Sequence, residues 1–286
     1  MKRALLFGGA GQLGTEIRRR WTDWEFTAPS HTEVDIGNDD AVAAAIVRAQ
    51  PDAVINCAAF HNVDRCEEQP GEAMAVNALA VGRMARRCNE AGTRFVTIST
   101  DYVFDGTATR PYTEDDRPRP ISAYGVSKYA GELLVEMLES PALIVRTCGV
   151  YGVRPSTSKG HTFVDRIVAQ GRAREPIRVV DDVVASPTFA GDLAAALEAL
   201  VASGAAGLCH AANVGPVSWF DFAREVLRQA KIDHPVEPIS RLQWKAPARR
   251  PAYSALANAR LESLGLAMPS WQEGIASYLE LAVSWS

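Results

Sequence analysis

The sequence predicts an α/β protein built on a doubly wound parallel sheet, with helices on both faces. Apolar runs of strand length alternate with amphipathic stretches of helix length along the first 150 residues, as in a parallel sheet. The first apolar run leads directly into Gly8-Gly-Ala-Gly11-Gln-Leu-Gly14 and then into a helical pattern. A glycine turn between the first strand and the first helix is typical of a Rossmann-type fold, which we therefore expect.

The first half of the sheet can be assigned in order. Residues 3–7, Arg-Ala-Leu-Leu-Phe, form a short apolar run and are expected to be the first strand. The helix-like Thr-Glu-Ile-Arg-Arg follows at residues 15–19, and residues 24–28, Trp-Glu-Phe-Thr-Ala, alternate as a second strand does. Residues 39–49 are expected to be a helix, and the apolar run at residues 51–59 a buried strand.

The second half continues the alternation. Residues 71–91 have helical periodicity, and residues 94–100, Arg-Phe-Val-Thr-Ile-Ser-Thr, are expected to be the next strand. The helix that carries Tyr124 and Lys128 runs on toward Leu138, and residues 143–147 are strand again. Beyond about residue 150, Pro, Gly and Trp interrupt the pattern. There we expect an amphipathic helix from Trp219 and a core-facing helix with Trp271 and Tyr278 seven residues apart.

Composition excludes several classes of protein. The 286 residues are 47% hydrophobic and 22% charged with a net charge of −4, which fits one large domain with a small appendage. No run of 18 uncharged apolar residues occurs, and the start of the chain does not resemble a signal peptide. We expect a cytoplasmic protein without membrane or nucleic-acid partners. The odd number of cysteines and the lack of C-x-x-C spacing suggest neither a disulfide framework nor a zinc site; they are Cys57, Cys66, Cys88, Cys148 and Cys209.

The glycine turn predicts dinucleotide binding. Its glycines permit a tight turn, let the backbone approach a pyrophosphate and let the helix pack against the strand. The helix N-terminus adds free N–H groups and a partial positive charge. We therefore expect residues 1–150 to form an NAD(P)-binding Rossmann domain to which parts of residues 151–200 return. Residues 151–286 are expected to form mainly a smaller substrate-binding region over the carboxyl ends of the strands, where ligands bind.

A candidate catalytic pair follows in Ser122-Ala-Tyr-Gly-Val-Ser-Lys128. Tyr124 and Lys128 are one helical turn apart and share a face. A cation beside a phenol favours phenolate and is expected to lower the pKa of Tyr124, which makes it a candidate general acid. Ser99 and Thr100 place two hydroxyls at the end of a strand, on the ligand side of the sheet. Taken singly, these residues also fit a solvated helix face and a turn.

Together these motifs resemble an extended short-chain dehydrogenase/reductase, and within that group the dTDP-4-dehydrorhamnose reductase family. The resemblance covers nearly the whole chain. It is carried by the ordered series of the glycine turn, Val34-Asp-Ile36, Asn56-Cys-Ala-Ala59, Val63-Asp64, Asn77, Ser99-Thr-Asp-Tyr-Val-Phe-Asp-Gly106, Tyr124-Gly-Val-Ser-Lys128, Arg146-Thr147, Val150-Tyr-Gly152, Val180-Asp-Asp182, Ser186-Pro-Thr188 and Arg250-Pro251 with Ser254.

The resemblance implies that NAD(P)H delivers hydride to C4 of a nucleotide-linked 4-keto-6-deoxyhexose, with dTDP-4-dehydrorhamnose as the first choice and dTDP-rhamnose as the product. It gives Thr100 a hydrogen bond to the C4 oxygen, Tyr124 the proton, and Lys128 the nicotinamide ribose and the phenolate. It also implies that the sugar nucleotide is contacted by Val63, Asp64, Arg65, Thr100 and Tyr102. The implied cofactor contacts are Gly8, Gly11, Gln12, Leu13, Ser30, His31, Asp35, Ile36, Cys57, Ala58, Ala59, Ser99, Tyr124 and Lys128.

The choice of cofactor depends on the end of the second strand. An acid there accepts hydrogen bonds from the ribose diol and repels a 2′-phosphate. This chain has Pro29-Ser-His31 at that place. NADPH is therefore expected, with Ser30 and His31 near the phosphate, and use of NADH stays open.

Several alternatives remain. Dehydratases of the group carry Asp-Glu after the threonine, whereas this chain has Asp101-Tyr102, which favours simple reduction. Gly149 stands where the family usually has a Trp, so either Tyr102, Phe60 or His161 fills that space or the sugar differs. A nucleotide-sugar epimerase and a non-catalytic regulatory protein on the same scaffold are the other readings. Arg249 and Arg250 suit a diphosphate or simply face solvent. A homodimer is also open, and no metal is expected.

Overall fold

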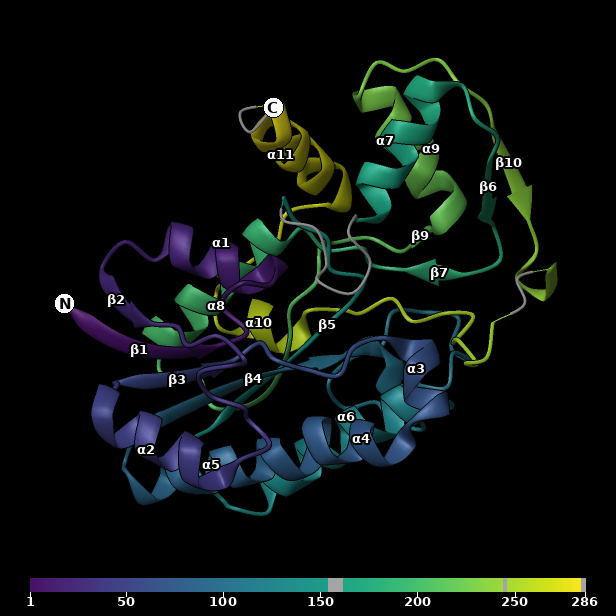
Figure 1. Cartoon of the computed structure of the whole chain (residues 1–286). Coiled ribbons are helices and arrows are strands. Elements are labelled where there is room, and N and C mark those ends of the chain that lie inside the picture. Colours follow the sequence, from purple (N-terminus) through teal and green to yellow (C-terminus); the bar gives the residue numbers. More distant parts are fainter. Residues whose placement is uncertain (154–161, 244–245, 284–286) are drawn as a thin grey trace.

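A computed structural model describes residues 1–153, 162–243 and 246–283. Its centre is a six-stranded sheet in which every neighbouring pair is parallel. The order is β2-β1-β3-β4-β5-β8 (Figure 1). The strands are β1 (Lys2–Phe7), β2 (Trp24–Thr27), β3 (Ala53–Asn56), β4 (Arg94–Thr100), β5 (Leu143–Thr147) and β8 (Gly207–His210). The predicted doubly wound sheet is confirmed.

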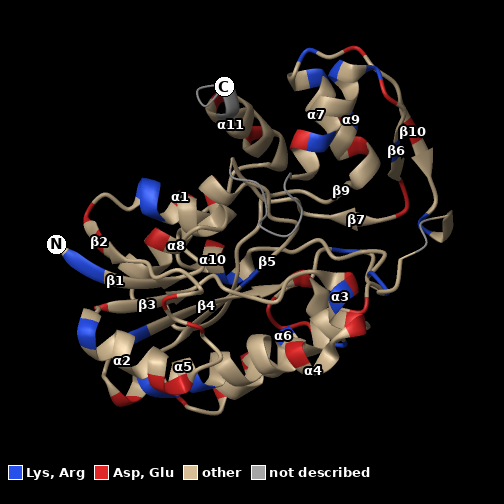
Figure 2. Ribbon diagram, in the orientation of Figure 1, with Lys and Arg blue, Asp and Glu red and all other residues tan. Residues whose placement is uncertain are grey.

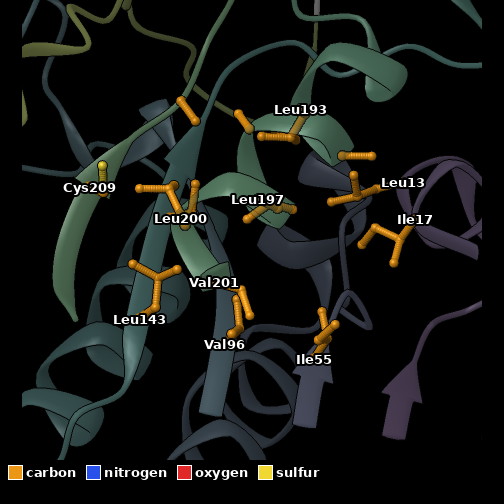
Figure 3. Packing of buried hydrophobic residues seen from close by; sticks show 14 of the residues in the cluster. Leu13, Ile17, Ile55, Val96, Leu143, Leu193, Leu197, Leu200, Val201 and Cys209 are labelled. Atoms are coloured by element: carbon orange, nitrogen blue, oxygen red, sulfur yellow. The ribbon is translucent and has the colours of Figure 1, made fainter. Parts of the chain in front are cut away.

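Helices cover both faces of this sheet (Figure 1). On one face lie α1 (Gln12–Arg20), α8 (Ala190–Ala202) and α10 (Ala259–Ser263), and on the other lie α2 (Asp39–Ala49), α5 (Val81–Glu90) and α6 (Ala123–Glu136). Figure 3 shows leucines of α8 and the apolar side chains of α1 packed onto the strands. The strands read as continuous apolar runs because both of their faces are buried in this way.

The strand order reverses between β1 and β3. The chain passes from β1 outward to β2 and then returns to the other side of β1. In such sheets a crevice opens beyond the carboxyl ends of the strands at this switch point. Phe7 and Asn56, the last residues of β1 and β3, are paired there, so the glycine turn after β1 and the segment after β3 border the crevice.

The predicted helix at residues 71–91 is divided into three parts. They are α4 (Pro70–Met74), a π-helical segment η1 (Ala75–Ala80) and α5. The buried Asn77 in the π segment accepts a hydrogen bond from the Phe60 N–H and donates to the Phe60 carbonyl oxygen and the Ser127 hydroxyl. A side-chain Cβ at Gly131 of α6 would collide with the Asn77 carbonyl oxygen. These contacts hold the π segment against α6.

A second region stands beside the main sheet (Figure 1). It contains the parallel pair β6 (Ile177–Val180) and β10 (Val236–Ile239) and the antiparallel pair β7 (Val184–Ala185) and β9 (Val217–Ser218). Its helices are α7 (Phe163–Ala173), α9 (Trp219–Gln229) and α11 (Trp271–Val283), and η3 (Arg241–Gln243) follows β10. Trp271 and Tyr278 pack into its apolar core, as their spacing predicts. Between these pieces, α8 and β8 return to the main sheet.

Charged side chains of both signs are distributed over the helices that surround the sheet (Figure 2). Within the described ranges, no helix is long and apolar enough to cross a membrane. The five cysteines are free, and four of them are buried. Among the described residues no cluster of His, Cys, Asp and Glu could hold a metal ion.

Candidate active site

Thr100 ends β4 at the ligand side of the sheet and is buried. Its Oγ1 accepts a hydrogen bond from the Tyr102 N–H at 3.2 Å and donates to Asp101 Oδ1 at 3.1 Å. The hydroxyl thereby caps the single turn η2 (Asp101–Val103), which carries Tyr102. Asp101 is itself buried and accepts a further hydrogen bond from the Cys148 thiol at 3.1 Å. This turn is therefore firmly held to the strand end.

Tyr124 lies in the first turn of α6, directly opposite η2. Ser122 begins the helix by accepting the Gly125 N–H at 3.2 Å. A Cβ at Gly125 would collide with the Tyr102 carbonyl oxygen, so a glycine is needed for α6 to approach η2 this closely. The Tyr124 phenol lies close enough to the Thr100 hydroxyl to influence its ionisation, and the Tyr124 and Tyr102 rings meet edge to face at 5.8 Å.

The predicted lowering of the Tyr124 pKa is wrong for the protein alone. Burial raises the pKa of Tyr124 well above its usual range, and the hydrogen bond with Thr100 opposes this only in part. Loss of water around the phenol disfavours phenolate more than nearby groups favour it. Tyr124 is therefore a protonated phenol at neutral pH.

Lys128 lies one turn further along α6 and is 5% exposed. Its Nζ donates to the Ile98 carbonyl oxygen of β4 at 2.6 Å. Burial lowers the pKa of Lys128 to about 8, while the negative charge of Glu132 and the nearby Cys57 act in the opposite direction. Since Cys57 follows β3, the ammonium group lies close to the border of the crevice. Thr100, Tyr124 and Lys128 are thus brought together as predicted.

The glycine turn has the shape that a close ligand requires. Gly8 has a φ of +76°, and a Cβ on it would lie 2.7 Å from the Ala58 nitrogen and from the Cys57 carbonyl carbon. The Gly11 N–H donates to the Gly8 carbonyl oxygen at 3.0 Å, which closes the turn. Gln12 and Leu13 then begin α1, with Leu13 buried in the core and Gln12 partly exposed. The backbone of Cys57, Ala58 and Ala59 runs beside this turn.

A cavity of about 400 Å³ opens beside the same turn. It lies between the start of α1 and the edge strand β2, and Arg18 and Arg19 of α1 line it. The Arg19 guanidinium is paired with Glu16, with Nη2 2.7 Å from Oε2. Side chains in a helix point toward its N-terminus, which brings these arginines back toward the glycines. The lining residues are Gly9, Ala10, Thr15, Arg18, Arg19 and Phe26.

The loop after β2 holds an acid that the sequence reasoning missed. The N–H and hydroxyl of Ser30 both donate to Glu33, at 2.7 and 2.8 Å. Pro29-Ser-His31 itself contains no acid, but Glu33 folds back across the turn and brings a carboxylate to this edge. His31 lies exposed with its Nδ1 3.9 Å from Asp35, and Ile36 is buried beneath the loop. The Ser-x-x-Glu spacing of Ser30 and Glu33 is the sequence pattern from which this contact could have been predicted.

Ser99 is placed differently from the other predicted cofactor contacts. Its side chain is buried, and its hydroxyl donates to Glu132 of α6. Glu132 also pairs with Arg146 of β5, with Nη2 2.6 Å from Oε2. The Ser99 hydroxyl thus belongs to a buried polar cluster beneath the site.

Three of the predicted substrate contacts lie in α3 (Val63–Glu68), namely Val63, Asp64 and Arg65. Asp64 accepts the Arg250 guanidinium at 2.9 Å and the Ala248 N–H at 3.2 Å, so that it ties α3 to the loop before Ser254. Arg65 is exposed, bonds Gln69 at 3.2 Å and lies over the Phe60 ring. Val63 is partly buried at the start of α3. Arg250 is therefore held in an ion pair and does not extend freely into solvent.

The space beside Gly149 is bordered by an indole from α9. A Cβ on Gly149 would lie 3.1 Å from Cη2 of Trp219, and Gly149 has a φ of +52°. Trp219 itself packs against Phe163 at 4.8 Å. Of the residues expected to fill this space, Tyr102 lies at the site, Phe60 is held under Arg65, and His161 falls outside the described residues. Trp219 was not foreseen because it is 70 positions away in sequence.

Comparisons with known proteins agree on one family. The model described as "RmlD substrate binding domain" matches residues 1–283. A dTDP-4-dehydrorhamnose reductase of Mycobacterium tuberculosis is 39% identical over 287 residues, which cover 97% of this chain and 92% of that protein.

Two solved structures agree with this. A dTDP-4-dehydrorhamnose reductase from Clostridium acetobutylicum superposes with a TM-score of 0.92 at 37% identity, covering 98% of this chain and 99% of that one. The enzyme of the same name from Bacillus anthracis, solved in complex with NADP, also gives 0.92 at 34% identity, with 97% and 98% covered.

Proposed function

Because the chain belongs to the RmlD family of dTDP-4-dehydrorhamnose reductases, within the extended short-chain dehydrogenases/reductases, we propose that it reduces the C4 ketone of a nucleotide-linked 4-keto-6-deoxyhexose. The substrate is dTDP-4-dehydrorhamnose, the product is dTDP-rhamnose, and the reductant is NADPH. One observation carries the proposal most directly. The Tyr124 phenol, in the first turn of α6, lies beside the Thr100 hydroxyl at the carboxyl end of β4, with Lys128 one turn further along α6.

The crevice fits a reduced nicotinamide dinucleotide. A Cβ on Gly8 would collide with the backbone of Cys57 and Ala58, so only glycine lets the turn pass this close to the end of β3, and the start of α1 beside it offers free N–H groups to a pyrophosphate. When bound, NADPH supplies the hydride. Lys128 is placed to hold the nicotinamide ribose. Gly8, Gly11, Gln12 and Leu13 are the proposed pyrophosphate contacts, and Asp35, Ile36 and Cys57 to Ala59 the proposed contacts further along the crevice.

Tyr124 supplies the proton that ketone reduction requires. As hydride arrives at C4, the C4 oxygen becomes an alkoxide and takes the phenolic proton of Tyr124, which becomes phenolate. A high pKa suits this role, because the phenol is fully protonated before the reaction begins. The ammonium group of Lys128 then stabilises the phenolate. Thr100 donates a hydrogen bond to the same oxygen once substrate draws its hydroxyl away from Asp101.

The substrate lies over Tyr102 and the start of α3 in this proposal. Tyr102 presents an aromatic ring beside Tyr124, and Val63 and Asp64 lie at the N-terminal turn of α3. Because Asp64 is paired with Arg250, the two residues contribute to substrate binding as a unit. Arg65 is exposed on the same helix and is the outermost of these contacts. Trp219 beside Gly149 gives the crevice a second aromatic wall.

The 2′-phosphate of NADPH is proposed to bind in the cavity beside the glycine turn. Arg18 and Arg19 line it, and guanidinium groups bind phosphate oxygens strongly. Ser30 and His31 lie on the loop after β2. The carboxylate of Glu33 already engages Ser30, and in that position it disfavours a phosphate close to Ser30. The arginines are therefore the main cationic contacts.

A homodimer and a cytoplasmic location complete the proposal. The outer surface of η1 and α6 exposes apolar side chains, which favours self-association. They are Leu79, Val126, Leu133 and Met137. Sedimentation equilibrium of the purified protein would give twice the chain mass if this is so, and the chain mass alone would exclude the dimer.

The decisive assay mixes the purified protein with NADPH and dTDP-4-dehydrorhamnose and follows the absorbance of reduced nicotinamide. Stoichiometric oxidation of NADPH with formation of dTDP-rhamnose is expected. Isomerised sugar without net cofactor oxidation would indicate the epimerase instead. Neither reaction, together with tight binding to a partner enzyme that persists in Tyr124→Phe, would indicate the regulatory protein.

A further inference from the structure

Glu132 occupies an unusual position behind the proposed catalytic residues. It is four residues beyond Lys128 and eight beyond Tyr124 in α6, so that all three lie toward one face of the helix. Its side chain is 2% exposed. The carboxylate accepts the Ser99 hydroxyl and the Arg146 guanidinium, whose Nε and Nη2 lie at 3.0 and 2.6 Å. Both carboxylate oxygens are therefore engaged by buried donors.

These contacts connect the three elements that build the site. Glu132 belongs to α6, which carries Tyr124 and Lys128. Ser99 belongs to β4 and precedes Thr100, and Arg146 belongs to the adjacent strand β5. The carboxylate thus ties the helix with the proton donor to the strand with the second hydroxyl. A shift of α6 along β4 would break these hydrogen bonds.

The buried ion pair of Glu132 and Arg146 is not explained by a contribution to the stability of the fold. Removing two charges from water costs several kcal/mol per ion, and apolar replacements of similar volume are often equally stable. The side chain of Arg146 is also 2% exposed, lies over the Phe104 ring at 5.3 Å, and leaves its Nη1 without a partner among the described residues. An arrangement this costly points to a role in the reaction.

We propose that Glu132 is a positioning residue for the reduction, which keeps Lys128 charged and holds Tyr124 within hydrogen-bond distance of Thr100. This rests on the proposed function. Glu132 touches neither substrate nor cofactor, because Ser99 and Arg146 occupy its oxygens. It acts through Lys128 and through the docking of α6, and Arg146 neutralises the rest of its charge.

The charges around Lys128 support this assignment. Burial alone would drive Lys128 toward the neutral amine, and it lowers the pKa to about 8. Glu132 on α6 is the largest opposing influence, and Cys57 at the end of β3 is the other. Glu136 lies a further turn along α6 and interacts with Glu132 and Arg146. The contact from β4 is the carbonyl oxygen of Ile98.

The test is the pH dependence of kcat in Glu132→Gln. Lys128 is charged below its pKa, so activity falls as pH rises through that value. Removing the negative charge lowers the pKa of Lys128, and the alkaline limb is expected to move down by about one pH unit. At pH values above the wild-type pKa of Lys128, kcat is expected to fall about tenfold, and at neutral pH about twofold, while KM for the sugar nucleotide changes little. The NADPH dissociation constant should show the same shifted pH dependence.

Two matched variants separate charge from packing. Arg146→Lys keeps the cation beside Glu132 and is expected to leave the alkaline limb in place even if the thermal midpoint falls. Glu136→Gln removes a carboxylate from the next turn of the same helix, where it is exposed, and should also leave the limb unchanged. If Glu132→Gln does not fold, the double variant Glu132→Gln, Arg146→Gln removes both buried charges. It should still show a downward shift, smaller than that of Glu132→Gln because loss of the Arg146 cation acts in the opposite direction.

A lower thermal midpoint with an unmoved alkaline limb in the glutamine variants would overturn the proposal, because a merely structural residue behaves in that way. Failure of the proposed function is distinguishable. In that case the wild-type protein reduces no 4-keto sugar at any pH, and the pH dependence of NADPH affinity still decides whether Glu132 controls Lys128.

Discussion

At the scale of single residues, the proposed mechanism gives two tasks to two residues: Tyr124 donates the proton, and Lys128 stabilises the phenolate that remains. Burial keeps the Tyr124 phenol protonated. In the proposed reaction the buried ammonium group of Lys128 stabilises the phenolate when it forms. Reduction therefore needs no low phenol pKa in the resting protein. The reaction needs a proton donor in place and a cation beside that donor when the phenolate charge forms.

Replacing Tyr124 with Phe tests this division of roles. The ring remains and the proton is lost, so kcat is expected to fall by about 10²–10⁴-fold. NADPH affinity and the thermal midpoint should change little, since the ring contact with Tyr102 is kept. Stopped-flow measurement of NADPH oxidation gives the rate. A variant with more than a tenth of wild-type kcat would exclude Tyr124 as the proton donor.

Cofactor preference is predicted to depend on Arg18 and Arg19. Replacing both with Ala should weaken NADPH binding by about 10-fold or more, as the loss of a charged hydrogen bond to phosphate does, and leave NADH binding unchanged. Nucleotide fluorescence titration measures both constants. Arg172→Ala, an exposed arginine in the last turn of α7, is the matched control. Equal weakening of NADPH and NADH would place the phosphate elsewhere.

Residues that lie close together in sequence were predictable, and those joined only by folding were not. Tyr124 and Lys128 share one helical turn, and Thr100 ends a clear apolar strand, so their meeting follows from the topology of a parallel sheet. Glu132 and Arg146 meet only because α6 packs on β4 and β5. Trp219 reaches Gly149 from a different region. No local pattern encodes these contacts, although a glutamate on the face of Tyr124 and Lys128 is a usable signal.

At the scale of elements, the position of α6 depends on glycines. Gly125 and Gly131 let this helix approach η2 and the π segment, where a Cβ would collide with the Tyr102 and Asn77 carbonyl oxygens. The collision partners are backbone atoms, which cannot turn aside as a flexible side chain can. The close approach of α6 to these two segments therefore depends on the absence of a side chain at both glycines.

Gly125→Ala is expected to push α6 away from η2. We predict a loss of about 1–3 kcal/mol in the free energy of unfolding, as overpacking usually costs, and a fall in kcat larger than that in Gly71→Ala. Gly71 lies in α4 with nothing near its Cβ position, so alanine there is a matched control. Urea denaturation and steady-state kinetics measure the two effects. Unchanged kcat in Gly125→Ala would show that this approach is not needed for the reaction.

The strands and helices of the main sheet before residue 150 were predicted in the right order, but the apolar run at residues 51–59 contains only β3 (Ala53–Asn56), and α8 and β8 were not predicted. Both faces of each strand are buried, which produces continuous apolar runs bounded by turns. The π segment was not predictable, since its hydrogen bonds depend on Asn77 reaching Phe60 and Ser127. The pairs β6 with β10 and β7 with β9 were also missed, because strands of two to four residues carry too little periodicity.

At the scale of the whole molecule, the site lies where the second region meets the main sheet. A small apolar cluster joins η2, Cys148 just after β5, β7 and the loop after β8, and Asp64 pairs with Arg250 across the same boundary. His210 of β8 adds a further connection, because its Nδ1 lies 3.2 Å from the Tyr112 carbonyl oxygen and 3.1 Å from that of Ala257. The His210 ring thus holds β8 together with the segments at Tyr112 and Ala257, which are distant in sequence.

Stability is predicted to fall in mild acid because of His210. The ring is fully buried, and burial together with the nearby Arg146 lowers its pKa from 6.5 to about 4. Between these values the unfolded chain takes up a proton that the folded protein does not. Stability is therefore lost as pH falls from 6.5 to 4, with a slope of about 1.4 kcal/mol per pH unit from this residue.

Urea denaturation across that pH range measures the slope. His210→Gln should be less stable than wild type at pH 7 but lose stability less steeply toward pH 4. His31→Gln, at an exposed histidine, should leave the slope as it is. If His210→Gln has the wild-type slope, the acid sensitivity arises from other groups.

The most direct measurement of the central claim follows a single hydrogen. NADPH that carries deuterium at the transferable position of its nicotinamide is incubated with the protein and dTDP-4-dehydrorhamnose, and the product is analysed by NMR and mass spectrometry. Our account predicts one deuterium at C4 of the sugar, one NADPH oxidised per product, and loss of transfer in Tyr124→Phe. Product without deuterium at C4, or transfer that persists undiminished without the phenol, would contradict it.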